Sequence, residues 1–185
     1  TIKKCKAYPI YCNPASTSYA ITLKKNIITG NSKKIDGIRA DSGKLILSSN
    51  TISSCSRAII LSSKVKGTVY PNTFKKNTYN NVKVNSSYVN TLTVKSLSGK
   101  SKSAKTATLN WKKLSSASGY VVYRSASKNG SYTKISTIKK NKTITYKDSK
   151  LKRKSTYYYK IVPYTTIGKT TVYGLDSKIV SIKIK

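Results

Sequence analysis

The sequence contains no glutamate, histidine or methionine, and its acidic residues are four aspartates. General acid and base catalysis needs positioned titratable groups, so this scarcity leaves little from which to build an active site. The 37 lysines and arginines give a net charge of +33, with 15 of them before residue 93 and 22 after it. Such a surface repels itself and attracts polyanions in a salt-dependent way, although lysines also serve as generic solubilising side chains on exposed strands.

Long apolar segments are missing too, because no run of 18 apolar residues occurs, and no transmembrane helix is expected. Cysteine is scarce: Cys5, Cys12 and Cys55 have spacings that match neither a zinc site nor a CxxC motif. No metal, cofactor or redox pair is predicted. Cys5 and Cys55 are expected to be buried thiols too far apart to pair. A disulfide between Cys5 and Cys12 is possible, but nothing in the sequence supports it.

Asparagine recurs at regular intervals in the first half, where Asn26, Asn50 and Asn72 are separated by 24 and 22 residues. Short, mostly apolar triplets keep the same register around these asparagines, which indicates three short strands in each turn of a repeat. The opening Thr1–Cys5 matches Thr51–Cys55, so the chain is expected to begin in the middle of a turn. The triplets occupy residues 21–23, 45–47, 68–70, 38–40, 59–61 and 82–84.

Three-residue strands linked by Ser, Asn, Gly and Lys can bury a continuous apolar column only if they stack as coils. Residues 1–90 therefore resemble the last coils of a right-handed parallel β-helix of the pectate-lyase-like superfamily, truncated at the N-terminus. Asn26, Asn50 and Asn72 are expected to form a hydrogen-bonded ladder of turn residues. Two inward columns are predicted: Ile28, Ile52 and Phe74, and Ile38, Ile59 and Val82.

The second half, residues 91–185, has longer alternating segments with turn signals about every ten residues, which is typical of a β-sandwich. Residues 98–103 are expected to form a loop. The predicted strands are Thr91–Leu97, Thr106–Trp111, Tyr120–Ser125, Tyr132–Ile138, Thr143–Lys147, Thr156–Thr165 and Ser177–Ile184, seven in all.

Leu109-Asn110-Trp111, followed by Gly119-Tyr120-Val121-Val122-Tyr123-Arg124 and then by Leu151 six residues before Tyr157, resembles fibronectin type III modules. The resemblance implies a seven-stranded sandwich and a structural core of Trp111, Tyr120, Leu151, Tyr157 and Tyr159. No Arg-Gly-Asp sequence is present, so integrin binding does not carry over. The fold predicted for the whole chain is all-β, with β-helix coils followed by this sandwich.

Asp36, Arg39 and Asp41 form the only constellation that suggests catalysis, because β-helix lyases and hydrolases use Asp, Lys and Arg on one exposed sheet. Asp36-Gly37 and Asp41-Ser42-Gly43 are explained more simply as turn signals. Asp148 and Asp176 are expected in solvated sandwich loops. No catalytic residue is assigned.

The sequence favours a non-catalytic binding or spacer region of a secreted or cell-surface bacterial protein, associated with an acidic polysaccharide or a cell-wall polyanion. An alternative is the accessory C-terminal part of a polysaccharide lyase or glycoside hydrolase whose active coils lie upstream. Nucleic-acid binding is a third alternative, which only the positive charge supports.

Overall fold

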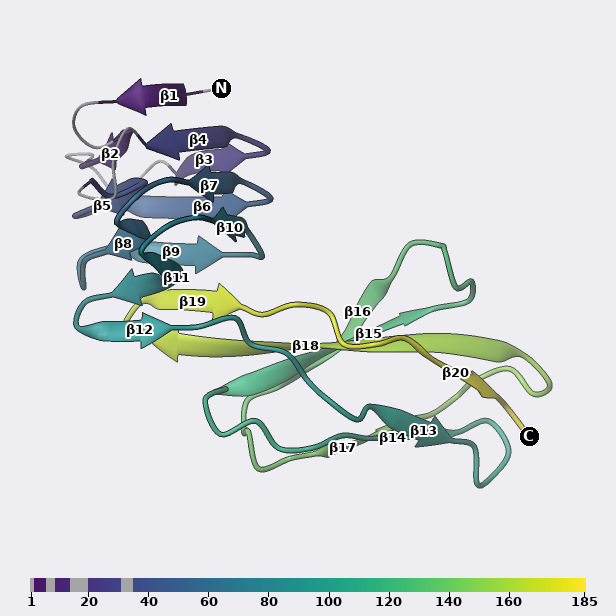
Figure 1. Ribbon diagram of the computed structural model, residues 1–185. Coiled ribbons are helices and arrows are strands. Elements are labelled where there is room, and N and C mark those ends of the chain that lie inside the picture. Colours follow the sequence, from purple (N-terminus) through teal and green to yellow (C-terminus); the bar gives the residue numbers. More distant parts are fainter. Residues whose placement is uncertain (1, 6–8, 14–19, 31–34) are drawn as a thin grey trace. The chain divides into compact units, whose positions relative to one another are not determined.

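The computed structural model describes residues 2–5, 9–13, 20–30 and 35–185, and every regular element in these ranges is a β-strand (Figure 1). The all-β class predicted from the sequence is confirmed. The chain divides into two compact units, Thr1–Thr91 with Thr166–Tyr173, and Leu92–Thr165 with Gly174–Lys185. We call them the parallel-strand unit and the antiparallel unit. Residues 166–173, which the sequence assigned to the sandwich, thus group with the N-terminal unit.

The parallel-strand unit contains three sets of short strands. The first sheet has the order β1 (Ile2–Cys5), β4 (Ile27–Gly30), β7 (Thr51–Ser53) and β10 (Thr73–Lys75), and Figure 1 shows these four strands one below another. The second sheet places β2 (Ile10–Cys12), β5 (Ile38–Ala40), β8 (Arg57–Leu61) and β11 (Tyr79–Val84) in parallel, and it ends with the antiparallel β12 (Ser87–Val89). The third set comprises β3 (Ala20–Lys24), β6 (Lys44–Ser48), β9 (Lys66–Val69) and β19 (Thr170–Tyr173), all parallel.

Strand register places equivalent apolar residues opposite one another. Ile28 pairs with Ile52, and Ile52 pairs with Phe74, which confirms the first predicted column. Ile28 and Ile52 are fully buried and Phe74 is half-buried. The second column is confirmed in the same way, since the register aligns Ile38, Ile59 and Val82.

The strand β19 was not predicted in this unit. Val172 lies opposite Val69, and the Thr170 hydroxyl donates a 3.0 Å hydrogen bond to the carbonyl of Val65. Gly67 permits this approach, because a Cβ there would stand 2.9 Å from Oγ1 of Thr170. β19 follows β9 by about a hundred residues in sequence, so no repeat spacing could reveal it.

The antiparallel unit contains two sheets. One has the order β13 (Ser98–Lys100), β14 (Ala107–Asn110) and β17 (Thr145–Asp148); the other has the order β16 (Thr133–Ile138), β15 (Gly119–Ser125), β18 (Thr156–Ile167) and β20 (Val180–Lys183). Their shared core contains Leu109 from the first sheet and Tyr120, Tyr159 and Ile161 from the second. Two sheets whose inner faces share one core form a β-sandwich.

The prediction for the first sandwich strand was wrong. Thr91–Leu97 forms only an isolated bridge between Thr93 and Leu175, whereas Ser98–Lys100, predicted as a loop, forms β13. β13 is short, and its exposed ends are polar, so it has no apolar alternation to detect. A Cβ on its central residue, Gly99, would lie 2.5 Å from Cδ1 of Ile182, so a larger residue there would require core side chains to move.

Candidate polymer-binding surface

The three recurring asparagines lie in consecutive turns of the parallel-strand unit. Nδ2 of Asn26 donates to Oδ1 of Asn50 at 3.1 Å, and Nδ2 of Asn50 donates to Oδ1 of Asn72 at 2.9 Å. Asn50 is fully buried and also donates to the carbonyl of Leu23 at 2.9 Å. Because the amide groups bond to protein atoms, they fasten turns together and do not face a ligand.

A further asparagine of this unit, Asn77, is buried and was missed by the sequence interpretation. Its Oδ1 accepts a 2.9 Å hydrogen bond from the backbone N–H of Cys55, and its Nδ2 donates to the carbonyl of Ile52 at 2.9 Å. Asn77 follows Cys55 by 22 residues, the same step that separates Asn50 from Asn72. That spacing was the signal that could have identified it.

Asp41 and Arg39 lie together at the end of β5. Nε of Arg39 donates to Oδ1 of Asp41 at 3.2 Å, and the Tyr11 hydroxyl donates to Oδ2 at 2.8 Å. The carboxylate therefore connects strand β2 to the end of the neighbouring β5. Gly43, two residues on, has a φ of 86°, so the chain turns there through a conformation that favours glycine.

Asp36 is engaged by a different cation. It is buried, and its Oδ1 lies 3.3 Å from Nε of Arg57, close enough for charge attraction although the N–H does not point at the oxygen. Gly37 beside it permits close packing, because a Cβ there would lie 2.5 Å from Cγ2 of Ile52. Asp36 and Asp41 thus belong to separate ion pairs.

The aromatic residues singled out in the second half lie in or against the sandwich core. Trp111 is 4% exposed and meets Tyr120 edge-on, with ring centroids 5.3 Å apart. Leu151 is buried, and Tyr157 is partly buried against the same core. The Tyr157 hydroxyl accepts a 3.3 Å hydrogen bond from the backbone N–H of Lys152, five residues earlier in the chain.

Tyr159 and Asp148 form a buried polar network with Arg124. Oδ2 of Asp148 accepts hydrogen bonds from the Tyr159 hydroxyl and from Nη1 of Arg124, both at 2.9 Å. Burial, followed by the bond to Asp148, raises the pKa of Tyr159 far above its usual value. Burial alone would lower the pKa of Arg124, but the hydrogen bond and charge of Asp148 outweigh it and raise that pKa.

The outward face of the second sheet carries an aromatic and cationic row. Register places Tyr11 opposite Arg39, Arg39 opposite Ile60, Ile60 opposite Lys83, and Lys83 opposite Tyr88. Tyr11 and Tyr88 are each 51% exposed, and Nζ of Lys83 lies 5.4 Å from the Tyr88 ring centroid. This face offers flat rings beside positive charges.

All four carboxylate side chains are already paired with basic residues of the same unit. Asp176 lies 2.6 Å from Nζ of Lys160, on the antiparallel unit. The other pairs are Asp36 with Arg57, Asp41 with Arg39, and Asp148 with Arg124. Since basic side chains outnumber these carboxylates 37 to 4, most of the positive charge depends on external anions for neutralisation.

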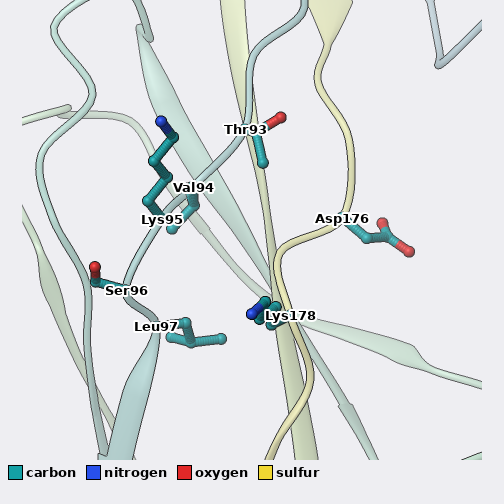
Figure 2. Close-up of a pocket in the computed structure, with 7 residues that line it drawn as sticks. All are labelled: Thr93, Val94, Lys95, Ser96, Leu97, Asp176 and Lys178. Atoms are coloured by element: carbon teal, nitrogen blue, oxygen red, sulfur yellow. The ribbon is translucent and has the colours of Figure 1, made fainter.

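A pocket of about 460 Å³ lies in the antiparallel unit. It is lined by one segment, Thr93 to Leu97, together with Asp176 and Lys178 (Figure 2). Figure 2 shows the side chains of Lys95 and Asp176 extending in different directions from the two segments that line the pocket. The sequence did not single out this pocket.

Cys12 and Cys55 are both buried as thiols, and burial raises the pKa of Cys12. The Cys5 side chain lies outside the part of the chain that the structure describes. The structure therefore does not test a disulfide between Cys5 and Cys12. Within the described ranges, Cys and Asp side chains form no group of three that could hold a metal ion. In the same part of the chain, no helix is long and apolar enough to cross a membrane.

No protein-family model matches the sequence, and no curated protein matches it. Among solved structures, an Fn3-like protein from Clostridium thermocellum is 30% identical, with a TM-score of 0.41, over 49% of this chain and 88% of that chain. The sixth fibronectin type III domain of human fibronectin type III domain containing protein 3 is 19% identical, with a TM-score of 0.43, over 52% of this chain and 87% of that chain.

A β-1,2-glucanase from Parabacteroides distasonis is also similar, at 19% identity and a TM-score of 0.39, over 49% of this chain and 13% of that enzyme. Given the 30% identity to the Fn3-like protein and the two antiparallel sheets around Trp111, this chain contains a fibronectin type III-like module.

Proposed function

We propose that this chain is a non-catalytic binding region of a secreted or cell-surface bacterial protein, and that it associates with an anionic polymer. The observation that carries the proposal is the charge: 37 basic side chains face four carboxylates, and each carboxylate is held in an internal ion pair. An extended polyanion can neutralise many such cations at once and release its own counterions.

The parallel-strand unit is, in this proposal, the last part of a right-handed parallel β-helix of the pectate-lyase-like superfamily. Three runs of parallel strands whose neighbours within residues 1–91 pair at steps of 21 to 28 residues support it, as do the hydrogen bonds among Asn26, Asn50 and Asn72. The asparagines then act as turn fasteners, and Asp36, Arg39 and Asp41 stabilise the coils. Fibronectin type III domains are commonly extracellular, which suits a secreted or surface location.

The row from Tyr11 to Tyr88 is the proposed contact face on this unit. Exposed tyrosines offer flat surfaces for sugar rings, and Lys83 supplies charge for acidic groups, whereas Arg39 is already paired with Asp41. The row crosses neighbouring strands, so it suits an extended chain better than a small compact ligand.

The test is a titration of the chain against polygalacturonate, lipoteichoic acid, duplex DNA and a neutral glucan at low and physiological salt. The affinity for polyanions should fall steeply as salt increases, and the neutral glucan should bind weakly. A salt-independent preference for the neutral glucan would contradict the proposal. Equal, salt-sensitive binding to all three polyanions would support generic charge attraction and would show no preference for acidic polysaccharide.

A matched pair of variants locates the contact face. Lys83→Gln removes one charge from the row, and Lys75→Gln removes the same charge from β10 in the first sheet. Lys83→Gln should weaken polygalacturonate binding more than Lys75→Gln. Equal losses would place the contact elsewhere on the surface.

A further inference from the structure

The pocket in the antiparallel unit lies between two chain segments that are joined at one end. The backbone N–H of Leu175 donates a 2.8 Å hydrogen bond to the carbonyl of Leu92, and Thr93 forms an isolated bridge with Leu175. Beyond this point the segments 94–97 and 176–178 form no paired strand with one another, and the pocket occupies the space they line (Figure 2).

Both walls of the pocket are anchored to the sandwich. Val94 is 4% exposed and belongs to the core cluster. Ser177 is buried: its N–H donates to the carbonyl of Ile161, and its hydroxyl oxygen accepts from the N–H of Ile161, both at 2.9 Å. Asp176 and Lys178 flank this anchored residue and are both exposed. The backbone walls of the pocket are therefore built into the fold before any ligand arrives.

The lining combines three kinds of chemistry. Among the residues that the structure describes, neither Lys95 nor Lys178 is paired with a carboxylate, so two ammonium groups stand ready for an anion. Thr93 and Ser96 contribute hydroxyl groups. Leu97, half-buried against the core, contributes an apolar surface.

Asp176 adds a hydrogen-bond acceptor to this cationic pocket. Its Oδ2 lies 2.6 Å from Nζ of Lys160, and that same Nζ lies 4.7 Å from the Tyr132 ring centroid. The ion pair leaves Asp176 with further acceptor capacity, since an ionised carboxylate offers about four lone-pair sites. The pocket thus contains two lysines that attract an anion and one carboxylate, Asp176, that can accept hydrogen bonds from hydroxyl groups.

We propose that this pocket binds one uronic acid residue of an acidic polysaccharide. A sugar carboxylate would face Lys178, and its C–H face would cover Leu97. The exposed side chains of Lys95 and Asp176 would turn toward the sugar, Lys95 to the carboxylate and Asp176 to the ring hydroxyls. Inorganic phosphate suits the site less well, because Asp176 repels the phosphate dianion. The dianion also has only one hydroxyl group that could donate a hydrogen bond to Asp176. A neutral sugar gains nothing from the two lysines. A volume of about 460 Å³ lies within the usual range for small-ligand sites.

This inference rests on the proposed binding of an anionic polymer, and it names the sugar residue of that polymer that the pocket recognises. The whole chain should be titrated with trigalacturonate, a neutral glucose trimer and inorganic phosphate by calorimetry, with backbone amide shifts followed by NMR. Trigalacturonate should bind tightest and should shift the amides of residues 93–97 and 176–178. Equal affinity for phosphate, or shifts confined to other segments, would overturn the assignment.

Variants separate this pocket from generic charge. Lys178→Gln should weaken trigalacturonate binding by about fivefold, the upper range for one exposed ion pair. Lys147→Gln, an exposed lysine on β17, should change it by less than about twofold. Equal effects of the two substitutions would contradict the proposal.

Asp176→Asn tests the discrimination between sugar and phosphate. The substitution should weaken trigalacturonate binding while it leaves phosphate binding unchanged or stronger, because a negative charge is removed. A parallel loss for both ligands would contradict the role given to Asp176. If wild-type protein binds no polyanion at all, the proposed function fails; if it binds polygalacturonate but the pocket variants behave like Lys147→Gln, this inference alone fails.

Discussion

The two units bury their cores by different means. The parallel-strand unit aligns aliphatic residues such as Ile28 and Ile52 from successive turns and fastens the turns with buried asparagine. The antiparallel unit surrounds an aromatic pair, Trp111 and Tyr120, and buries a carboxylate, Asp148, with two partners. Contacts in a stack reach only the neighbouring turns, whereas a sandwich core joins strands from the whole module. Damage should therefore stay local in the first unit and spread in the second.

The largest expected effect is that of Trp111→Ala, which should destabilise the antiparallel unit by about 3–5 kcal/mol, as for other buried large aromatics. Protection from hydrogen exchange should fall across all the sandwich strands and stay near wild type in β4, β7 and β10. Exchange measured by mass spectrometry in increasing denaturant checks this, since the substitution removes the single tryptophan. Tyr88→Ala, at an exposed position, is the control. A loss under about 1 kcal/mol would show that Trp111 does not support the core.

A smaller effect is expected from Asn50→Ala in the parallel-strand unit. The substitution removes the side-chain bonds to Asn26, Asn72 and Leu23 and leaves buried backbone groups unpaired, at a cost of about 1–3 kcal/mol. Asn26→Ala should cost less, because Asn26 is only half-buried. Denaturant unfolding followed by circular dichroism compares the two variants. Equal losses would mean that burial does not set the strength of the ladder.

The smallest effect concerns pH and Tyr159. Because its pKa is raised in the folded state, its stabilising contribution is complete below about pH 10, the usual tyrosine value, and declines above it as the unfolded state ionises first. Tyr159→Phe should cost about 1 kcal/mol at pH 7, and this difference from wild type should shrink above about pH 10. Other tyrosines with raised pKa values are present in both proteins, so their contributions cancel in the stability difference between wild type and variant. Urea unfolding at pH 7, 10 and 11 measures the difference, and a constant value would refute the expectation.

The sequence predicted those parts of the fold that repeat or alternate. Asparagine spacing located the parallel pairs, since stacked turns must place equivalent residues one turn apart. The polar β13 gave no alternation, and β19 lies outside the repeat, so neither could be found in this way. The pocket joins Lys95 to Lys178, more than eighty residues apart, and no local pattern connects two segments at such a separation.

The parallel-strand unit is discontinuous in sequence, because β19 follows β9 only after most of the second module has been translated. A gene truncated after the codon for Thr91 would encode this unit without its last strand, and it would leave the β9 edge open to pairing with other chains. Recombination at that codon would have the same result. The segment encoding residues 166–173 must therefore be inherited together with the first ninety residues, which favours exchange of the two modules as one block.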